Sequence, residues 1–524
     1  MKKLSLLDLG FFVTESEESP KHVAGLMIFR RPAGAGEDFV KDLYDEYRRF
    51  DTPSEPFDQV IEFLSLRGPC WKKVGHFDIT EHVFYHRPRR PLSHDDLFYL
   101  IAELHTPVLD RTRPLWEFHV IDNVEGDRFA VYSKIHHAYA DGVTLTNWTS
   151  RSLGEDPADR ELRPVWVVSG GGRSGRRARQ RAALEMLRGV MKGSWEQLRT
   201  TGGLAKLMTQ LALEQVGLTR NAVSLPFRSD GKTGLTGRVS ADRQFAKAAV
   251  PMADVQRIRD MCRSTLNHVA LTCIDGALRR FLSEMKSNVD RPIAIQMPVS
   301  LRGQGEDGGG NRVGIVTVDL ASPTDDPYER LREIGFTLRN VRNQIDGVPP
   351  DAVMLYSIVT ALGAQLAEML GLSDVLPPIS DTLVSNVPGP RNPLYLKGAL
   401  LEEMCPVSTL MPGNRLNITL FSYAGTLHFG LIGTRQLGDL SHLAEYIQQA
   451  FVDLENAVFH PRSTMGSKKT TGSRGSRKKG RTTRARKKPS GPAGRAPKTG
   501  KTAATPGGKG ARRKKVPART EAKK

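Results

Sequence analysis

Cysteine, long apolar segments and basic charge in the body of the chain are all scarce in this 524-residue sequence. The four cysteines are far apart and form no C-x-x-C pair, which excludes a disulfide framework and a zinc knuckle and fits a reducing cytoplasm. The longest apolar segment, residues 352–372, contains Gln365 and Glu368 and is too short to cross a bilayer, which needs about 20 apolar residues. Asp8 interrupts the apolar stretch after Met1-Lys2-Lys3, so we expect no signal peptide.

The positive charge lies at one end of the chain. Residues 463–524 hold 22 Lys and Arg against one acid, a formal charge of +21, whereas residues 1–462 carry −2. Beyond His460 the chain has no aromatic residue and is predicted to be disordered, because its composition cannot bury enough apolar area to offset the entropy of ordering. This basic tail is open to three interpretations: a solubilising extension, a segment attracted to anionic lipid, or a binder of nucleic acid or another polyanion.

Period-two and helical patterns alternate along the rest of the chain and predict a mixed α/β fold. The predicted strands cover residues 23–29, 116–122, 128–135, 293–300, 313–320, 382–387, 416–422 and 426–432. The predicted helices cover residues 37–50, 255–262, 267–285, 326–345, 351–370 and 440–458. A glycine-rich interruption near residue 170, followed by a helical pattern over 176–216, marks a linker. The expected divisions are an N-terminal half, a helical linker, a C-terminal half and a disordered tail, at residues 1–153, 154–240, 241–460 and 461–524.

The strongest local signal is His136-His137-Ala138-Tyr139-Ala140-Asp141-Gly142, an H-H-x-x-x-D-G motif between a predicted strand and a helical stretch. It would arise by chance in a chain this long at roughly one in several hundred. A neutral imidazole, with a reference pKa of about 6.5, can take a proton from an attacking hydroxyl, which is typically worth about 10² to 10⁴ in rate. One histidine would face the substrate, while Asp141 and Gly142 fix the turn by hydrogen bonding or through an arginine partner. The alternative is a pair of structural histidines beside a strand end.

Together with Arg113-Pro114-Leu115-Trp116-Glu117, this motif resembles the bacterial wax ester synthase/acyl-CoA:diacylglycerol acyltransferase family. Residues 4–12 and 22–26 are similar to the family's opening. Its C-terminal motifs resemble three further segments, at residues 298–302, 310–312 and 385–390. The resemblance covers about residues 3 to 458.

This resemblance implies acyl transfer from a long-chain acyl-CoA to diacylglycerol or a fatty alcohol, with no covalent acyl-enzyme, no metal and no cofactor besides the acyl-CoA substrate. It implies the two-domain CoA-dependent acyltransferase fold of the chloramphenicol acetyltransferase type, with the histidines at the junction of the halves. His137 would be the general base, and His136 and Asp141 would support the site. The candidates for structural support are Gly142, Pro114, Trp116 and Arg302, the last as a partner of Asp141.

Three further residues are candidates for contacting the substrate or a developing oxyanion, namely Asn267, Asn386 and Ser385. The family usually has Asn-Asp where this chain has Asn267-His268, which leaves the acid's role open. An amide donor to an oxyanion is worth roughly 2.7 to 4 kcal/mol where measured. The alternatives are Asn267 as a helix N-cap and Asn386 as a turn residue before Pro388.

A second glycine motif, G-x-G-x-x-G over residues 303–308, does not predict a dinucleotide site. A predicted strand follows it in place of the required helix, and Glu306 and Asp307 would repel phosphate. A surface loop is the better interpretation.

Other functions remain open on the sequence alone. A condensation domain or an acyltransferase for a different small hydroxyl or amine acceptor shares the H-H-x-x-x-D-G motif, although this chain lacks carrier domains. A catalytically weak member could instead bind a lipid surface or nucleic acid through its tail. We expect a cytoplasmic enzyme held peripherally at an anionic membrane or lipid-droplet surface, with nucleic acid as a partner of the tail only.

Overall fold

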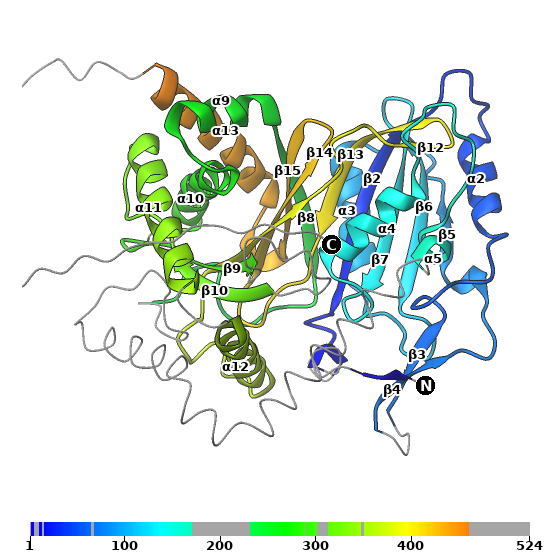
Figure 1. The fold of residues 1–524 in the computed structure, drawn as a ribbon, viewed down its shortest axis with the longest axis horizontal. Coiled ribbons are helices and arrows are strands. Elements are labelled where there is room, and N and C mark those ends of the chain that lie inside the picture. The colour runs from blue at the N-terminus through cyan, green and yellow to red at the C-terminus, as the bar shows by residue number, and fades with distance from the viewer. Residues whose placement is uncertain are drawn as a thin grey trace, which may run out of the picture. The chain divides into compact units, whose positions relative to one another are not determined.

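Alternating apolar residues build two six-stranded sheets, which lie side by side in the computed structural model (Figure 1). Residues 1–462 form one compact unit that contains both sheets. The structure describes residues 2–4, 10–12, 15–63, 68–169, 231–287, 289–300, 313–346 and 350–460.

The N-terminal sheet has the strand order β12-β13-β2-β7-β6-β5. Its strands are β2 (His22–Arg30), β5 (Val83–His86), β6 (Trp116–Val124), β7 (Arg128–His136), β12 (Tyr395–Leu396) and β13 (Ala399–Val407). A small sheet of order β1-β4-β3 accompanies it, formed by β1 (Lys2–Lys3), β3 (Gln59–Glu62) and β4 (Cys70–Lys73). The helices of this half are α2 (Phe39–Tyr47), η1 (Ile79–Glu81), α3 (His94–His105), α4 (Gly142–Ser152) and α5 (Val165–Val168). Strand β7 lies antiparallel between β2 and β6, so its end is held from both sides.

The C-terminal sheet has the order β10-β9-β11-β14-β15-β8. Its strands are β8 (Arg243–Pro251), β9 (Ala294–Ser300), β10 (Val313–Asp319), β11 (Thr382–Pro388), β14 (Leu416–Tyr423) and β15 (Thr426–Thr434). The helices of this half are α9 (Met252–Cys262), α10 (Leu266–Glu284), α11 (Pro327–Asp346), α12 (Pro350–Met369), η3 (Arg435–Leu437) and α13 (Leu440–Phe459). Helices α10 and α13 pack together and contribute to a large aliphatic core with the sheet.

Strands β12 and β13 differ from the expected division of the chain. They lie within residues 241–460, which we assigned to the C-terminal half, yet they extend the N-terminal sheet by pairing β13 with β2. The sequence pattern does not predict β13 as a strand, because Glu402 and Glu403 interrupt the apolar alternation. The structure pairs Glu402 with Arg30 at 2.6 Å and Glu403 with Lys247.

The mixed α/β fold is confirmed, and every predicted strand and helix outside the linker has a counterpart in the structure. The predicted linker helix at 176–216, the glycine loop at 303–308 and the basic tail lie outside the described residues. Among the described helices, none is both long and apolar enough to span a membrane.

Candidate active site

The H-H-x-x-x-D-G motif occupies the turn between β7 and α4, as its position in the sequence predicts. Three backbone N–H groups fix this turn. His137 donates to the carbonyl of Lys21 at 2.8 Å, and Tyr139 donates to the carbonyl of His136 at 2.9 Å. The third, of Ala138, donates to the Nδ1 atom of the His136 ring at 3.1 Å. Because each donor has a partner, the two imidazoles leave the sheet from a rigid backbone.

His136 is buried, with 0% of its surface exposed. Its ring stacks on Phe12 with 4.5 Å between centroids. Since Nδ1 accepts the N–H of Ala138, the proton of the neutral ring lies on Nε2, which is 3.4 Å from Oε1 of Glu15. At that distance the contact is electrostatic and not a well-aligned hydrogen bond. His136 is therefore held by a carboxylate and cannot reach a substrate from this position.

Glu15 is the buried centre of this network, with 1% of its side chain exposed. Its carboxylate accepts hydrogen bonds from the Lys21 backbone N–H at 2.9 Å and from Arg111 at 3.0 and 3.2 Å. Burial alone raises the pKa of Glu15, but His136, the Lys21 N–H and Arg111 outweigh it and hold the pKa below the usual 4.5. The carboxylate is thus ionised at neutral pH.

His137 has the opposite environment to its neighbour. Its side chain is half-buried, and its ring stacks on Phe11 with 4.7 Å between centroids and 23° between planes. Of the two histidines, only His137 combines a fixed ring plane with access from outside the core.

Asp141 and Gly142 join the motif to α4 and to the other half of the molecule. Asp141 is the N-cap of α4, and its carboxylate accepts the N–H of Thr144 at 2.9 Å. A Cβ atom added at Gly142 would lie 3.2 Å from Cγ2 of Val387 on β11. Glycine therefore allows the start of α4 to approach β11 closely. Arg302, the proposed partner of Asp141, lies outside the described residues.

The Pro114-Leu115-Trp116 segment, which leads into β6, supports the motif. The carbonyl of Leu115 accepts the N–H of His136 at 3.0 Å, and the N–H of Leu115 is bound by the Tyr139 hydroxyl at 3.0 Å. Trp116 is buried, and its Nε1 donates to the carbonyl of Phe57 at 3.0 Å. The Pro-Leu-Trp segment thus anchors both sides of the histidine turn.

Helix α10 begins two residues earlier than the N-cap interpretation of Asn267 requires, so that interpretation is wrong. Thr265 is the N-cap, and its hydroxyl accepts the N–H of His268 at 3.3 Å. The His268 ring completes a capping box, because Nδ1 accepts the N–H of Thr265 at 3.3 Å. The imidazole thus takes the capping position that an acid would fill, and Asn267 is released for another contact.

Asn267 meets Asn386, although 119 residues separate them in the chain. Nδ2 of Asn386 donates to Oδ1 of Asn267 at 2.8 Å. Asn386 lies inside β11, in register with Leu420 of β14, so its interpretation as a turn residue is wrong. The asparagine pair joins the first turn of α10 to the sheet.

Ser385 lies on the other face of β11. Successive strand residues point to opposite faces. Val384 packs into the aliphatic core of the C-terminal half, whereas Val387 packs against the core of the N-terminal half. Ser385 therefore lies on the same face of β11 as Val387, the face toward Gly142. Asn386 lies on the opposite face, toward α10. The Ser385 hydroxyl is 2.9 Å from that of Thr419, and either can donate.

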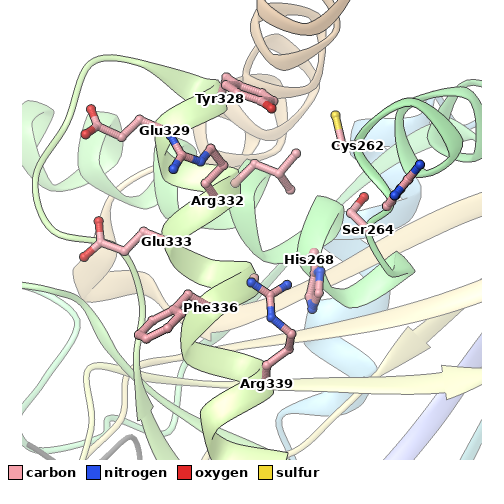
Figure 2. Close-up of a pocket in the computed structure, with 12 residues that line it drawn as sticks. Cys262, Ser264, His268, Tyr328, Glu329, Arg332, Glu333, Phe336 and Arg339 are labelled. Carbon is pink, nitrogen blue, oxygen red and sulfur yellow. The ribbon is translucent and has the colours of Figure 1, made fainter.

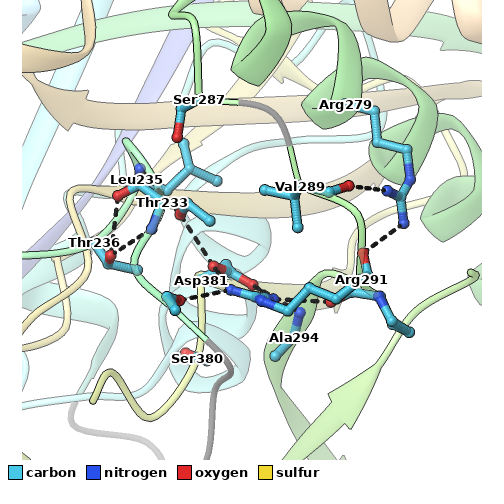
Figure 3. Close-up of polar contacts among 12 residues, drawn as sticks. Thr233, Leu235, Thr236, Arg279, Ser287, Val289, Arg291, Ala294, Ser380 and Asp381 are labelled. Carbon is cyan, nitrogen blue, oxygen red and sulfur yellow. Dashed lines mark hydrogen bonds and ion pairs between the residues drawn. The ribbon is translucent and has the colours of Figure 1, made fainter. Parts of the chain in front are cut away.

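The start of β11 is fixed by a buried aspartate (Figure 3). Asp381 binds Arg291 at 2.7 and 2.9 Å and accepts the N–H of Ala294 at 2.9 Å and the hydroxyl of Thr233 at 3.0 Å. These contacts tie three segments distant in sequence together. They fix the position of β11, the strand that carries Ser385 and Asn386.

The sequence did not assign roles to four residues of the site. They are Phe11, Phe12, Glu15 and Arg111, which hold the two imidazoles by stacking and charge. Phe11 and Phe12 belong to the opening segment that resembled the family, so that segment carried a signal. No local pattern marks Glu15 or Arg111. Among the described residues, no group of three or more His, Cys, Asp and Glu side chains could hold a metal ion.

Comparison with known proteins matches this arrangement to one family. The model of the wax ester synthase/diacylglycerol acyltransferase catalytic domain matches residues 4–270, and the C-terminal domain model matches residues 309–455. The chain belongs to this family. The O-acyltransferase WSD of Acinetobacter baylyi is 32% identical over 86% of this chain and 96% of the relative. A Mycobacterium tuberculosis protein named "Probable diacylglycerol O-acyltransferase" is 32% identical over 86% of this chain and 98% of the relative.

Solved structures agree with the family. The wax ester synthase/diacylglycerol acyltransferase from Marinobacter aquaeolei is 26% identical, with a TM-score of 0.66 over 87% of this chain and all of the neighbour. The first condensation domain of the calcium-dependent antibiotic synthetase is 14% identical, with a TM-score of 0.56 over 88% of this chain and 96% of the neighbour. The second likeness concerns the fold alone, and it confirms the two-domain acyltransferase architecture.

Proposed function

We propose that this chain is an O-acyltransferase that transfers a long-chain acyl group from acyl-CoA to the hydroxyl of diacylglycerol, with fatty alcohols as secondary acceptors. The products are triacylglycerol and wax ester. Membership of the wax ester synthase/diacylglycerol acyltransferase family supports the reaction class. Within the site, the proposal depends on one observation, which is that His137 is accessible while the adjacent His136 is fully buried.

His137 acts as the general base. Its stacking on Phe11 fixes the ring plane. Its proposed location at the junction of the two halves is supported by the contact between α4, which follows the motif, and β11 of the C-terminal sheet. His136, Glu15 and Asp141 act on the turn and do not touch the substrate.

The reaction requires no covalent enzyme intermediate. His137 takes the proton of the acceptor hydroxyl as its oxygen attacks the thioester carbonyl carbon, and a C–O bond forms. The tetrahedral intermediate then collapses with cleavage of the C–S bond. The imidazolium returns its proton to the leaving thiolate, which gives free CoA and the ester.

Ser385 is our candidate donor to the oxyanion, with the pair of Asn267 and Asn386 as positioning residues. The face of β11 that carries Ser385 also carries Val387, which leaves little room for a side chain at Gly142 of the motif. We expect Ser385→Ala to lower kcat by about 10² to 10³, the usual cost of one lost oxyanion donor. Asn386→Ala should lower kcat less and reduce thermal stability, because it detaches α10 from the sheet. The reverse ranking of kcat would assign the oxyanion to the asparagine pair.

The direct test measures release of free CoA thiol from palmitoyl-CoA with diacylglycerol or hexadecanol as acceptor. Thiol release that depends on the acceptor and is lost in His137→Ala would support acyl transfer with His137 as the base. Thin-layer chromatography identifies the product. Absence of release with both acceptors, or equal release by the variant, would overturn the proposal and favour a binding function.

The enzyme would work at a lipid surface, which we place at the C-terminal end of α12. Large apolar side chains are exposed there on described residues, namely Leu366, Met369, Leu370, Val375 and Leu376. The composition of the basic tail adds attraction to anionic lipid, at about 1 kcal/mol for each Lys or Arg near such a surface. Together they fit a peripheral enzyme at an anionic membrane or lipid droplet.

Vesicle co-sedimentation separates these contributions. Leu370→Glu should weaken binding to neutral and anionic vesicles alike, whereas deletion of residues 463–524 should weaken binding to anionic vesicles only. The deleted protein should keep turnover on dispersed acceptors. Loss of nucleic-acid binding with no change in vesicle binding would assign the tail to nucleic acid.

A further inference from the structure

A pocket of about 500 Å³ lies outside the histidine turn, between the end of α9, the first turn of α10 and α11 (Figure 2). A volume of this size is typical of sites for small molecules. Its lining includes Arg263, Ser264, His268, Tyr328, Arg332 and Arg339. The proposed mechanism uses none of these residues.

A buried donor lines this pocket. His268 is 7% exposed, and its Nδ1 accepts the Thr265 N–H, so the proton of the neutral ring lies on Nε2. Nε2 has no hydrogen-bond partner among the residues that the structure describes. Burial, followed by the nearby Arg339, lowers the pKa of His268, which agrees with a neutral ring that donates one hydrogen bond.

The cationic side chains of the pocket are also available. Within the described parts of the chain, the side chains of Arg263, Arg332 and Arg339 form no hydrogen bond or ion pair. Arg339 reaches from α11 toward His268, and a Cβ atom added at Gly335 would touch both side chains, at 3.5 and 3.4 Å. The positive charge therefore gathers around the unpartnered imidazole N–H.

Two carboxylates also line the pocket, but both are engaged elsewhere. Glu329 accepts the hydroxyl of Thr324 at 3.0 Å, and Glu333 accepts the hydroxyl of Ser322 at 2.7 Å. Both point away from His268 in Figure 2. The end of the pocket at α10 is left with donors and cations, which favours an anion such as phosphate.

An aromatic ring borders the same space. Tyr328 is 42% exposed and lines the pocket on the side of Cys262. An exposed aromatic beside a cationic end is suited to a nucleobase that carries phosphate, because every base has a face that can stack.

We propose that this pocket binds the phosphorylated adenosine end of CoA, with its phosphate on His268, Arg263 and Arg339 and its adenine against Tyr328. The inference rests on acyl-CoA being the donor of the proposed reaction. A chain of contacts connects the pocket with the motif. His268 follows Asn267, which binds Asn386, and the next residue of β11, Val387, would be met at 3.2 Å by a Cβ atom added at Gly142.

The experiment titrates the full-length protein with CoA and with 3′-dephospho-CoA by isothermal calorimetry, without acceptor. The wild type should bind CoA about tenfold or more tightly than 3′-dephospho-CoA, as expected for a lost charge-assisted hydrogen bond. His268→Asp retains a capping residue but places a negative charge in the pocket. It and Arg339→Gln should weaken CoA binding by about tenfold or more and reduce the preference for the 3′-phosphate.

Two further variants sharpen the result. Tyr328→Ala should weaken the binding of both ligands by about five-fold or more, because the adenine loses its stacking partner. Arg257→Gln is the matched control, since Arg257 is an exposed arginine of α9 that pairs with Asp254 and Glu455 and does not line the pocket. It should leave both affinities unchanged.

Unchanged CoA affinity in His268→Asp and Arg339→Gln would overturn the assignment, as would absence of CoA binding to the wild type. Loss of phosphatidic-acid vesicle binding in these variants with CoA binding intact would assign the pocket to a lipid phosphate and also overturn it. The thiol-release assay separates this inference from the reaction. If the enzyme transfers acyl groups but the variants bind CoA as the wild type does, only the assignment of the pocket is overturned. If CoA binds through the pocket but no acceptor is acylated, only the proposed reaction is overturned.

Discussion

The two halves of the molecule have different interiors. The N-terminal half buries histidines in a hydrogen-bonded network, as at His105, whose ring meets the Tyr132 hydroxyl at 2.7 Å and the Ser408 carbonyl at 3.0 Å. The C-terminal half is built on an aliphatic core of helices against a sheet. The half that supplies the proposed base thus fixes imidazoles by polar contacts, while the other half supplies a platform that carries Ser385 and the pocket at its edges.

The largest expected effect compares the adjacent histidines of the polar half. His137→Gln should lower kcat by about 10² to 10⁴, the usual contribution of a general base, and leave stability within about 0.5 kcal/mol because the ring is half-exposed. His136→Gln should lower the unfolding temperature, since it disturbs the stack on Phe12 and the contact with Glu15. Steady-state kinetics and thermal unfolding of both variants provide the measurement. A variant of His136 that loses activity while keeping full stability would contradict this division of roles.

A second prediction concerns the charge at the centre of the polar network. Glu15→Gln should destabilise the fold by about 3 kcal/mol, the lower end of the range for a broken buried pair, because Arg111 remains partly exposed. Chemical unfolding checks the value. The exposed pair of Glu62 and Lys72 supplies the control, and Glu62→Gln should leave the unfolding midpoint nearly unchanged. Equal effects of the two substitutions would show that burial does not distinguish these carboxylates.

One histidine from each half, His105 and His442, should contribute to stability with opposite dependence on pH. Burial, followed by Lys134 and Arg243, lowers the pKa of His105 to about 3, so the unfolded chain takes up this proton first as pH falls below about 6.5. The contribution of His105 to stability is therefore complete above pH 6.5 and is lost as pH falls. Glu284 raises the pKa of the exposed His442 in the C-terminal half, so its contribution is present at low pH and is lost as pH rises.

Unfolding measured at pH 6 and pH 5 tests this contrast. The wild type should lose about 1 kcal/mol more than His105→Gln over that interval, since one pKa unit corresponds to about 1.4 kcal/mol. His442→Gln should change the pH dependence slightly and in the other direction. A pH profile of His105→Gln parallel to that of the wild type would mean that His105 already binds its proton in the fold.

Local patterns predicted most of the fold but not the contacts that complete the site. The strand over residues 128–135 and the turn after it follow from alternation and from the motif. The carboxylate beside His136 could not be predicted, because Glu15 is 121 residues away and becomes its neighbour only when the opening segment packs on β7. Strand β13 was missed for a related reason, since its two glutamates break the apolar pattern and find their cationic partners only in the folded sheet.

The two asparagines also show that local patterns do not predict contacts between distant segments. The sequence marks Asn267 and Asn386 as candidate site residues, with a cap and a turn as their local alternatives. In the structure the two side chains form a hydrogen bond with each other. The different roles of Asn386 and Ser385 follow from the alternation of side chains along β11 and from the two different cores that its faces contact. That information depends on the sheet order, which no short motif contains.

The smallest expected effect compares the helix caps of the two halves. Thr265→Ala should cost about 1 kcal/mol, because the N–H of His268 loses the hydroxyl that caps α10. Asp141→Ala should cost a similar amount at α4, but it should also lower kcat, since Asp141 lies in the turn that carries His137. Asn267→Ala, whose side chain does not cap the helix, should destabilise less than Thr265→Ala in urea unfolding. A larger cost at Asn267 would mean that the bond to Asn386, and not the cap, sets the start of α10, and the pocket beside His268 would then depend on β11.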